Sequence, residues 1–244
     1  MIKLARNSVV NVYFSDMNKA LPYYNDKFDL KVGDHVFVEG ACEGILGRVT
    51  QISYSFKIKA DKYKKVISVA DSNIHGSFKL LPQYVLTSDR EALTYEKFLS
   101  WVKPPSDEEY IVSYSDESFT LDSINHIDID TIVMKKASSY YNENKVLYLE
   151  LCDGRVRAIV EGSEIYEVEF LYKDGKIISP LCDCYYLGVC KHIYASLMLF
   201  DYLLEEISNK YPNIEKDGYF AAALRSSFMD ITANNENFEG SICI

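Results

Sequence analysis

The sequence predicts an α+β protein in which a small β-barrel and a helical connector precede a larger α+β domain. Short β-branched runs separated by Gly, Asp and Asn turns fill residues 8–70. Three strongly alternating runs occupy residues 145–172, and an Asp-Gly pair follows two of them. After residue 190 the apolar residues change to the spacing of an amphipathic helix. These three patterns, in this order along the chain, define the predicted architecture.

Five short runs in the first part of the chain predict strands. They are SVVNVYF (8–14), KALPYYN (19–25), HVFVEG (35–40), GILGRVTQIS (44–53) and KKVISVA (64–70). Strands of this length, each ended by a turn, are typical of small closed barrels and sandwiches. The arrangement from Lys31 to Ser53 resembles the paired strands of SH3-like barrels and the small barrel at the front of primosomal helicases. We therefore predict a small SH3-like β-barrel over residues 1–75.

Residues 76–106 are predicted to form a helical connector. The apolar residues of TSDREALTYEKFLSWV (87–102) lie at helical spacing, and Ser88 followed by Glu91 has the spacing of a capping box. The proline pair that follows ends the helix, because proline offers no amide donor. The second domain is then predicted to cover residues 107–244.

The second domain is predicted to contain an antiparallel meander. A strand-like run, YIVSYS, and a helix around 127–142 come first. The alternating runs KVLYLEL (145–151), RVRAIVE (155–161) and YEVEFLY (166–172) follow, and Asp-Gly pairs end two of them. The last strand of this meander leads directly into Cys182.

Two helices are predicted after the meander. The first carries a buried face at spacings of four and three residues, formed by Ile193, Leu197, Phe200, Leu204 and Ile207. The second is predicted over residues 217–231, DGYFAAALRSSFMDI. The tail after it has no pattern that predicts an element.

Composition and charge limit the compartment and the partners. The chain is 48% hydrophobic and 25% charged, and no run approaches the roughly 18 apolar residues of a membrane span. No export signal is visible at the start, so we expect a cytoplasmic protein without membrane contact. The net charge of −10 is uneven, because residues 1–104 hold 15 basic and 11 acidic residues and residues 105–244 hold 11 and 25. The two halves are therefore expected to have different roles.

Four strong transition-metal ligands fall within the stretch LCDCYYLGVCKH. They are Cys182, Cys184, Cys190 and His192, with the spacing C-x-C-x5-C-x-H. Two follow the end of a predicted strand and two begin a predicted helix. Three thiolates and one imidazole suit a closed, tetrahedral, structural zinc site, and the net charge of −1 that they leave around Zn²⁺ is offset by Lys191 beside them.

Other interpretations of these cysteines remain open. The C-x-C pair has the composition of a redox pair, although that leaves Cys190 and His192 without a role. A catalytic Cys–His dyad is disfavoured because residues two apart on a helix do not face each other. Buried structural thiols are the third alternative.

The metal-ligand stretch resembles the SWIM zinc finger. C-x-C-x(n)-C-x-H at the end of a β-hairpin, followed by an apolar helix, is the motif of that family, and the likeness covers about residues 140–208. The five-residue gap is short for the family, so the loop 185–189 must be tight. The resemblance implies one zinc ion and a DNA- or protein-binding role. It extends to bacterial SWIM-bearing proteins that begin with a small barrel.

A second stretch, YSFKIKADKYKK (54–65), mixes basic and aromatic residues. Such a mixture can follow a nucleic-acid backbone while the rings stack on bases, whereas the alternative is a solvated edge strand whose lysines prevent aggregation. The candidate nucleic-acid-binding residues are Lys57, Lys59, Lys62, Lys64, Lys65, Tyr54, Phe56 and Tyr63.

Motifs for catalysis are missing from the sequence. It has no phosphate-binding loop, dinucleotide-binding fingerprint, zinc-protease motif or nucleophile elbow. We therefore expect a non-enzymatic, zinc-binding accessory factor that contacts DNA or RNA through the barrel. The alternative is a protein-interaction module that meets a protein partner through the acidic second half.

Overall fold

The computed structural model describes residues 6–114, 118–122, 130–211, 214, 218–233 and 238–243. The chain forms two compact units, each assembled from separate stretches of sequence. The first unit contains Met1–Asn73, Glu96–Glu108 and Ile231–Phe238; the second contains Ile74–Tyr95, Glu109–Asp230 and Glu239–Ile244. These bounds divide the chain differently from the three consecutive segments predicted above. Each unit holds one β-sheet, and helices accompany the sheets, so the predicted α+β class is confirmed.

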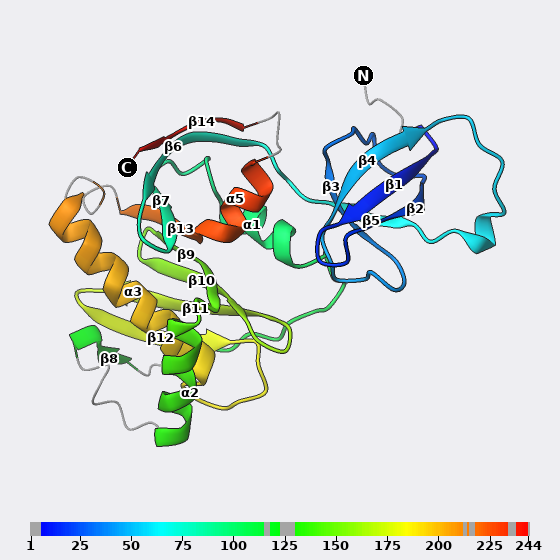
Figure 1. The fold of residues 1–244 in the computed structure, drawn as a ribbon. Helices are drawn as coiled ribbons and strands as arrows, with labels where there is room; N and C mark the ends of the chain where they lie inside the picture. Colours follow the sequence, from blue (N-terminus) through cyan, green and yellow to red (C-terminus); the bar gives the residue numbers. More distant parts are fainter. Residues whose placement is uncertain are drawn as a thin grey trace. The chain divides into compact units, whose positions relative to one another are not determined.

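The first unit contains a five-stranded antiparallel sheet in the order β2-β1-β4-β3-β5 (Figure 1). All five predicted strands are present. In β1 every second residue is buried, which places Val10, Val12 and Phe14 in the core of this unit. The bounds of the strands are β1 Ser8–Phe14, β2 Lys19–Asn25, β3 His35–Val38, β4 Gly47–Ser53 and β5 Val66–Val69.

The described strands of the first unit form an open sheet and not the closed barrel that the sequence predicts. The sheet ends at β2 and β5. These two edges meet at one place, where Tyr24 forms an isolated parallel bridge with Lys65 and its amide donates to the Lys64 carbonyl at 2.9 Å. Because β5 is only four residues long, it is too short to build a full ladder with β2.

The second unit contains a nine-stranded sheet in the order β14-β6-β7-β13-β9-β10-β11-β12-β8. The predicted meander forms its centre, since β9 to β12 pair consecutively and antiparallel. Asp153-Gly154 and Asp174-Gly175 make the tight turns, and all four residues have positive φ, as primed hairpin turns require. The strands are β6 Ile74–Leu80, β7 Tyr84–Thr87, β8 Ser118–Thr120, β9 Val146–Cys152, β10 Arg155–Glu161, β11 Ile165–Lys173, β12 Lys176–Cys182, β13 Tyr219–Leu224 and β14 Phe238–Cys243.

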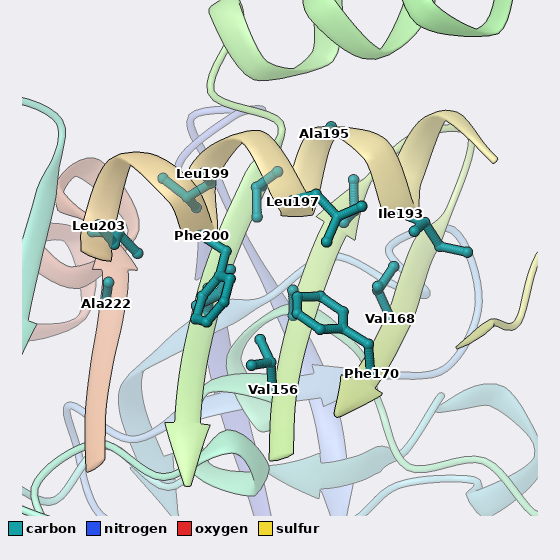
Figure 2. Close-up of a cluster of buried hydrophobic side chains, with 14 of the residues drawn as sticks. Val156, Val168, Phe170, Ile193, Ala195, Leu197, Leu199, Phe200, Leu203 and Ala222 are labelled. Carbon is teal, nitrogen blue, oxygen red and sulfur yellow. The ribbon is translucent and has the colours of Figure 1, made fainter. Parts of the chain in front are cut away.

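A long helix, α3, packs its apolar face on this sheet. Figure 2 shows Ile193, Leu197 and Phe200 pointing at the strands, where they meet residues of β10 and β11. Four of the five predicted residues are buried: Ile193, Leu197, Phe200 and Ile207. Leu204 is partly exposed, and the neighbouring Leu203 is fully buried in its stead. The helices are α1 Tyr95–Val102, α2 Thr131–Asn142, α3 Lys191–Lys210 and α5 Arg225–Thr232, with a 3-10 helix, η1, at Ala60–Lys62. None of the helices in the described ranges has the length and apolar character that crossing a bilayer demands.

The predicted helical connector, residues 76–106, also contains strands. β6 and β7 precede the helix and join the large sheet, and α1 begins at Tyr95 instead of directly after Ser88. The run YVLT of β7 is fully buried, and a short continuous apolar run of this kind carries no periodicity by which a strand can be recognised.

The predicted helix over 217–231 is half wrong, because YFAAAL forms β13 between β7 and β9. Its first five residues are buried, so pairing on both sides outweighs the helical preference of three consecutive alanines. The strand predicted for YIVSYS is also wrong for residues 110–114, which have no regular structure. The first residues of the predicted helix 127–142, 127–129, lie outside the described residues.

Candidate metal centre

The four predicted ligands converge where β12 ends and α3 begins. The ligand atoms of Cys182, Cys184, Cys190 and His192 all lie within 4.8 Å of one another. The Nδ1 atom of His192 is 3.5 Å from the sulfur of Cys182 and 3.8 Å from that of Cys190. Cys190 and His192 are buried, and the other two cysteines are half-buried. The structure therefore brings together every ligand that the sequence predicts.

A β-bulge in β12 sets which face of the sheet carries the cysteines. Val168 pairs with Cys182 and Leu171 pairs with Ile178, so β12 has one residue more than β11 between these pairs. The extra residue falls at Ser179-Pro180, where Ser179 has φ +50° and proline has no amide for the ladder. Because the bulge absorbs this extra residue, Cys182 stays paired with Val168 and lies on the same side of the sheet, which faces α3.

Cys190 is the N-cap of α3, and the helix itself begins at Lys191. The sulfur of Cys190 accepts a hydrogen bond from the Ile193 amide at 3.4 Å. Amides at a helix start have no partner within the helix, so a thiolate is favoured there. The chain thus uses the first turn of its longest described helix to hold two of the four ligands.

Cys190 is the cysteine of the cluster that most readily forms a thiolate. Its pKa is lowered to about 4, first because the Cys182 thiol donates a hydrogen bond to it, and also because of the His192 ring and the Ile193 amide. The pKa of Cys182 moves the opposite way, raised by its hydrogen bond to Cys190 and by burial. Burial is also the main cause that raises the pKa of Cys184.

Aromatic rings fix the orientation of His192. The Tyr166 ring is stacked on the imidazole, with centroids 4.1 Å apart, and the Tyr140 ring lies at 5.5 Å. The second ring nitrogen, Nε2, is buried and has no hydrogen-bond partner among the described residues. The stacking therefore directs Nδ1 at the sulfurs without help from a hydrogen bond on Nε2.

Lys191 lies beside the cluster, with its ammonium group over the Tyr140 ring. The distance from Nζ to the ring centroid is 4.7 Å. The hydrogen bond with Tyr140 is the main cause that raises the pKa of Lys191, and the nearby Cys184 sulfur acts in the same direction. The lysine thus stays protonated next to the group of sulfurs.

This Cys3His cluster could hold a metal ion. A tetrahedral ion with metal–sulfur bonds of about 2.3 Å keeps its ligand atoms about 3.8 Å apart. The observed separations of 3.5 and 3.8 Å agree with that spacing, and all remaining separations are below 4.8 Å. The residues present fit such an ion with little rearrangement.

The basic stretch 54–65 lies in the first unit, mostly outside regular structure. Residues 54–59 form a loop, η1 follows, and β5 begins only at Val66, so the alternative of a solvated edge strand is wrong for most of this stretch. Exposed members of the stretch are Tyr54, Phe56, Lys57, Lys59, Lys62 and Lys64. Lys65 and Tyr63 are half-buried, and Lys65 pairs with Asp26 at 2.7 Å.

A buried ion pair in the second unit was not anticipated from the sequence. Arg157 on β10 donates to Glu150 on β9 at 2.9 and 2.7 Å, and Glu150 also accepts from the Tyr148 hydroxyl at 2.8 Å. Glu150 is only 3% exposed. The only sequence feature that pointed to this pair was Glu150, which lies within the apolar run KVLYLEL. Because side chains alternate along a strand, a glutamate at this position is equally consistent with a solvent-exposed face of the sheet.

No protein-family model matches this chain, and neither a curated protein nor a solved structure matches it. Its chemistry must therefore be argued from its own residues. The three remaining cysteines, Cys42, Cys152 and Cys243, are free and lie outside the cluster.

Proposed function

We propose that Cys182, Cys184, Cys190 and His192 bind one zinc ion as the structural centre of a SWIM-type zinc finger over residues 140–208. The observation that carries this proposal is the convergence of three sulfurs and one imidazole within 4.8 Å. Thiolate and imidazole donors in a tetrahedral set favour zinc over the hard cations magnesium and calcium, which take oxygen ligands. The ion would join the end of β12 to the start of α3.

A zinc ion in this set has a structural role and not a catalytic one. Four protein ligands complete its coordination, so no position is left for water or substrate. We place the protein in the cytoplasm, where a thiol cluster stays reduced; all six cysteines are free.

Elemental analysis of the native protein, purified without chelators, tests the zinc proposal. We expect one zinc per chain, and a Cys190→Ser variant that retains much less. A Cys243→Ser variant is the matched control, because Cys243 is exposed and outside the cluster. A metal content far below one per chain, or a Cys190→Ser variant with the native content, contradicts the proposal.

We further propose that the first unit binds single-stranded DNA or RNA as a non-catalytic accessory factor. The support is the loop 54–59, where Tyr54 is 43% and Phe56 36% exposed beside the exposed Lys57 and Lys59. Exposed rings can stack on bases while lysines contact phosphates. The guanidinium of Arg6 lies 4.3 Å from the centroid of the Tyr54 ring and adds a further positive charge.

Fluorescence anisotropy with a labelled single-stranded oligonucleotide at low salt tests this second proposal. Lys57→Glu/Lys59→Glu should weaken binding, whereas Lys19→Glu/Lys31→Glu changes the same charge at exposed lysines outside the stretch. Removing two phosphate contacts should reduce the slope of log K against log salt by about 1.4. If both double variants behave alike, or the wild type does not bind, the first unit has no nucleic-acid site in this stretch.

A protein-interaction role is the second candidate, and exposed apolar side chains of the second unit favour it. In the loop between two of the ligands, Tyr185 and Leu187 are 100% and 93% exposed. Ile111, in the irregular segment 110–114, is also 100% exposed. Large apolar side chains that are exposed to this degree favour a contact surface for a partner.

A further inference from the structure

A cleft of about 520 Å³ lies in the second unit, on the face of the sheet opposite α3. Register places Arg157 opposite Glu169, whereas Ala158 and Val168 belong to the core under α3. Side chains alternate along a strand, so the cleft residues occupy the other face. The cleft is lined by Tyr95, residues 110–114, Arg157, residues 167–169 and residues 181–183. Its volume suits a side chain with its flanking residues.

The positive charge in the floor of the cleft is paired with a buried carboxylate. The guanidinium of Arg157 lies 4.2 Å from the centroid of the Tyr95 ring and is paired with Glu150, which is almost fully buried. The Tyr148 hydroxyl binds both Glu150 and the Leu93 carbonyl, each at 2.8 Å. The single positive charge of the lining is therefore compensated from beneath.

The remaining charges of the lining are negative. Glu167, Glu169 and Asp183 contribute three carboxylates. Glu167 is held in place, since its Oε2 atom accepts from the Tyr95 hydroxyl at 2.8 Å and its amide donates to Asp183 at 2.9 Å. Burial, followed by the charge of Glu167, raises the pKa of Tyr95, so this hydroxyl stays a donor. Arg155 lies 3.8 Å from Glu169 and offsets part of its charge, so the excess of negative charge in the cleft comes mainly from Glu167 and Asp183.

The wall of the cleft is apolar and exposed. Tyr110, Ile111, Val112 and Tyr114 are between 54% and 100% exposed, and the ring of Tyr114 reaches Glu169 through its hydroxyl at 3.5 Å. Exposed apolar groups beside carboxylates favour a ligand that is itself cationic with apolar flanks.

We propose that this cleft receives an arginine side chain from an extended segment of a protein partner. The guanidinium pairs with the carboxylates of Glu167 and Glu169 and lies against tyrosine rings, which are the groups that recognise it best. Apolar residues on either side of the arginine cover Ile111 and Val112. This inference rests on the second candidate function, a protein-interaction role. Zinc binding and nucleic-acid binding are tested by the separate experiments described above, so their failure can be distinguished from the failure of this inference.

Three short peptides test the inference on the zinc-loaded full chain. The probe is acetyl-Gly-Leu-Arg-Leu-Gly-amide, and its affinity is measured by NMR titration. Replacing arginine by the neutral isostere citrulline should weaken binding by about tenfold or more, the effect of one lost charge-assisted hydrogen bond. Replacing both leucines by glycine should weaken it as well. Equal affinity for the arginine and citrulline peptides overturns the proposal. Equal affinity for the leucine and glycine peptides contradicts the part of the proposal in which apolar residues on either side of the arginine contact the cleft.

A matched pair of variants locates the binding site. Glu167→Gln/Glu169→Gln should reduce affinity for the arginine peptide to that of the citrulline peptide. Glu164→Gln/Glu205→Gln removes the same charge from exposed positions outside the cleft and should leave affinity unchanged. Equal effects of the two variants refute this site. The peptide comparison on the wild-type chain decides the matter even if the cleft variant does not fold.

Discussion

Cys190→Ser separates the metal-binding role of this residue from its capping role. Cys190 is the N-cap of α3 and accepts a hydrogen bond from Ile193. Serine is among the preferred N-cap residues, so its hydroxyl preserves the helix start. What the variant loses is the sulfur with the lowest pKa of the cluster. Its stability should therefore differ from wild type only when zinc is bound.

The magnitude follows from binding linkage. With free zinc buffered at about 1,000 times its Kd, binding stabilises the folded state by about 4 kcal/mol. In a protein of this size each kcal/mol raises Tm by about 2–4 °C. Chelation should accordingly lower the Tm of the wild-type second unit by about 8–16 °C. Helicity should persist below that temperature, because α3 buries Ile193, Leu197 and Phe200 in an apolar core that extends well beyond the three ligand cysteines.

The assay is thermal unfolding followed by circular dichroism, in zinc buffer and in chelator. Wild type and the Cys243→Ser control should show the full zinc-dependent shift, and Cys190→Ser less than half of it. The reasoning is refuted if Cys190→Ser responds to zinc as wild type does. It is equally refuted if the chelated variant unfolds well below the chelated wild type, because serine then fails as a cap.

Three further predictions concern the second unit and can be checked by urea denaturation. Phe200→Ala should destabilise it by about 3–5 kcal/mol, because Phe200 is fully buried. Leu204→Ala, at a partly exposed position, should destabilise it by only about 1 kcal/mol. Similar losses of stability in the two variants would contradict the packing of α3. Arg157→Met should cost about 3–5 kcal/mol by leaving Glu150 buried without its partner, and adding Glu150→Met should restore most of that loss. A double variant as unstable as the single one would argue against this pairing. Gly175→Ala should lower the free energy of unfolding by about 1–2 kcal/mol through backbone strain alone. The φ angle of Gly175 is +74°, and no atom of the described residues lies within 4 Å of the added Cβ. An unchanged stability would exclude the assigned turn.

Local patterns sufficed to predict the metal cluster and the strands that lead to it. Asp153-Gly154 and Asp174-Gly175 fixed the hairpins, and the change of apolar spacing after residue 190 marked α3. Ligands two residues apart at a strand end and at a helix start are close in sequence, so little tertiary information was needed to group them. Every predicted strand of the first unit was found for the same reason.

Features set by distant partners could not be predicted. YFAAAL forms β13 because β7 and β9 pair with it on both sides, which the run itself does not reveal. The first sheet stays open because β5 is too short to pair fully with β2, and this strand is shorter than the run KKVISVA that predicted it. The cleft combines Tyr95 with Arg157 and Glu167, which lie 62 or more positions further along the chain.

The bulge at Ser179-Pro180 means that the segment before the metal ligands has one residue more than the β11 segment that it pairs with. Ile178 pairs with Leu171 and Cys182 pairs with Val168, so three residues of β12 lie opposite two residues of β11. Deleting one of these three residues would give a regular ladder in which Cys182 still pairs with Val168, on the side of Cys190 and His192. If β12 kept its length but lost the bulge, the register would slip by one residue and turn Cys182 to the opposite face. The metal centre should therefore tolerate the loss of one residue from this segment better than a substitution that prevents the bulge from forming.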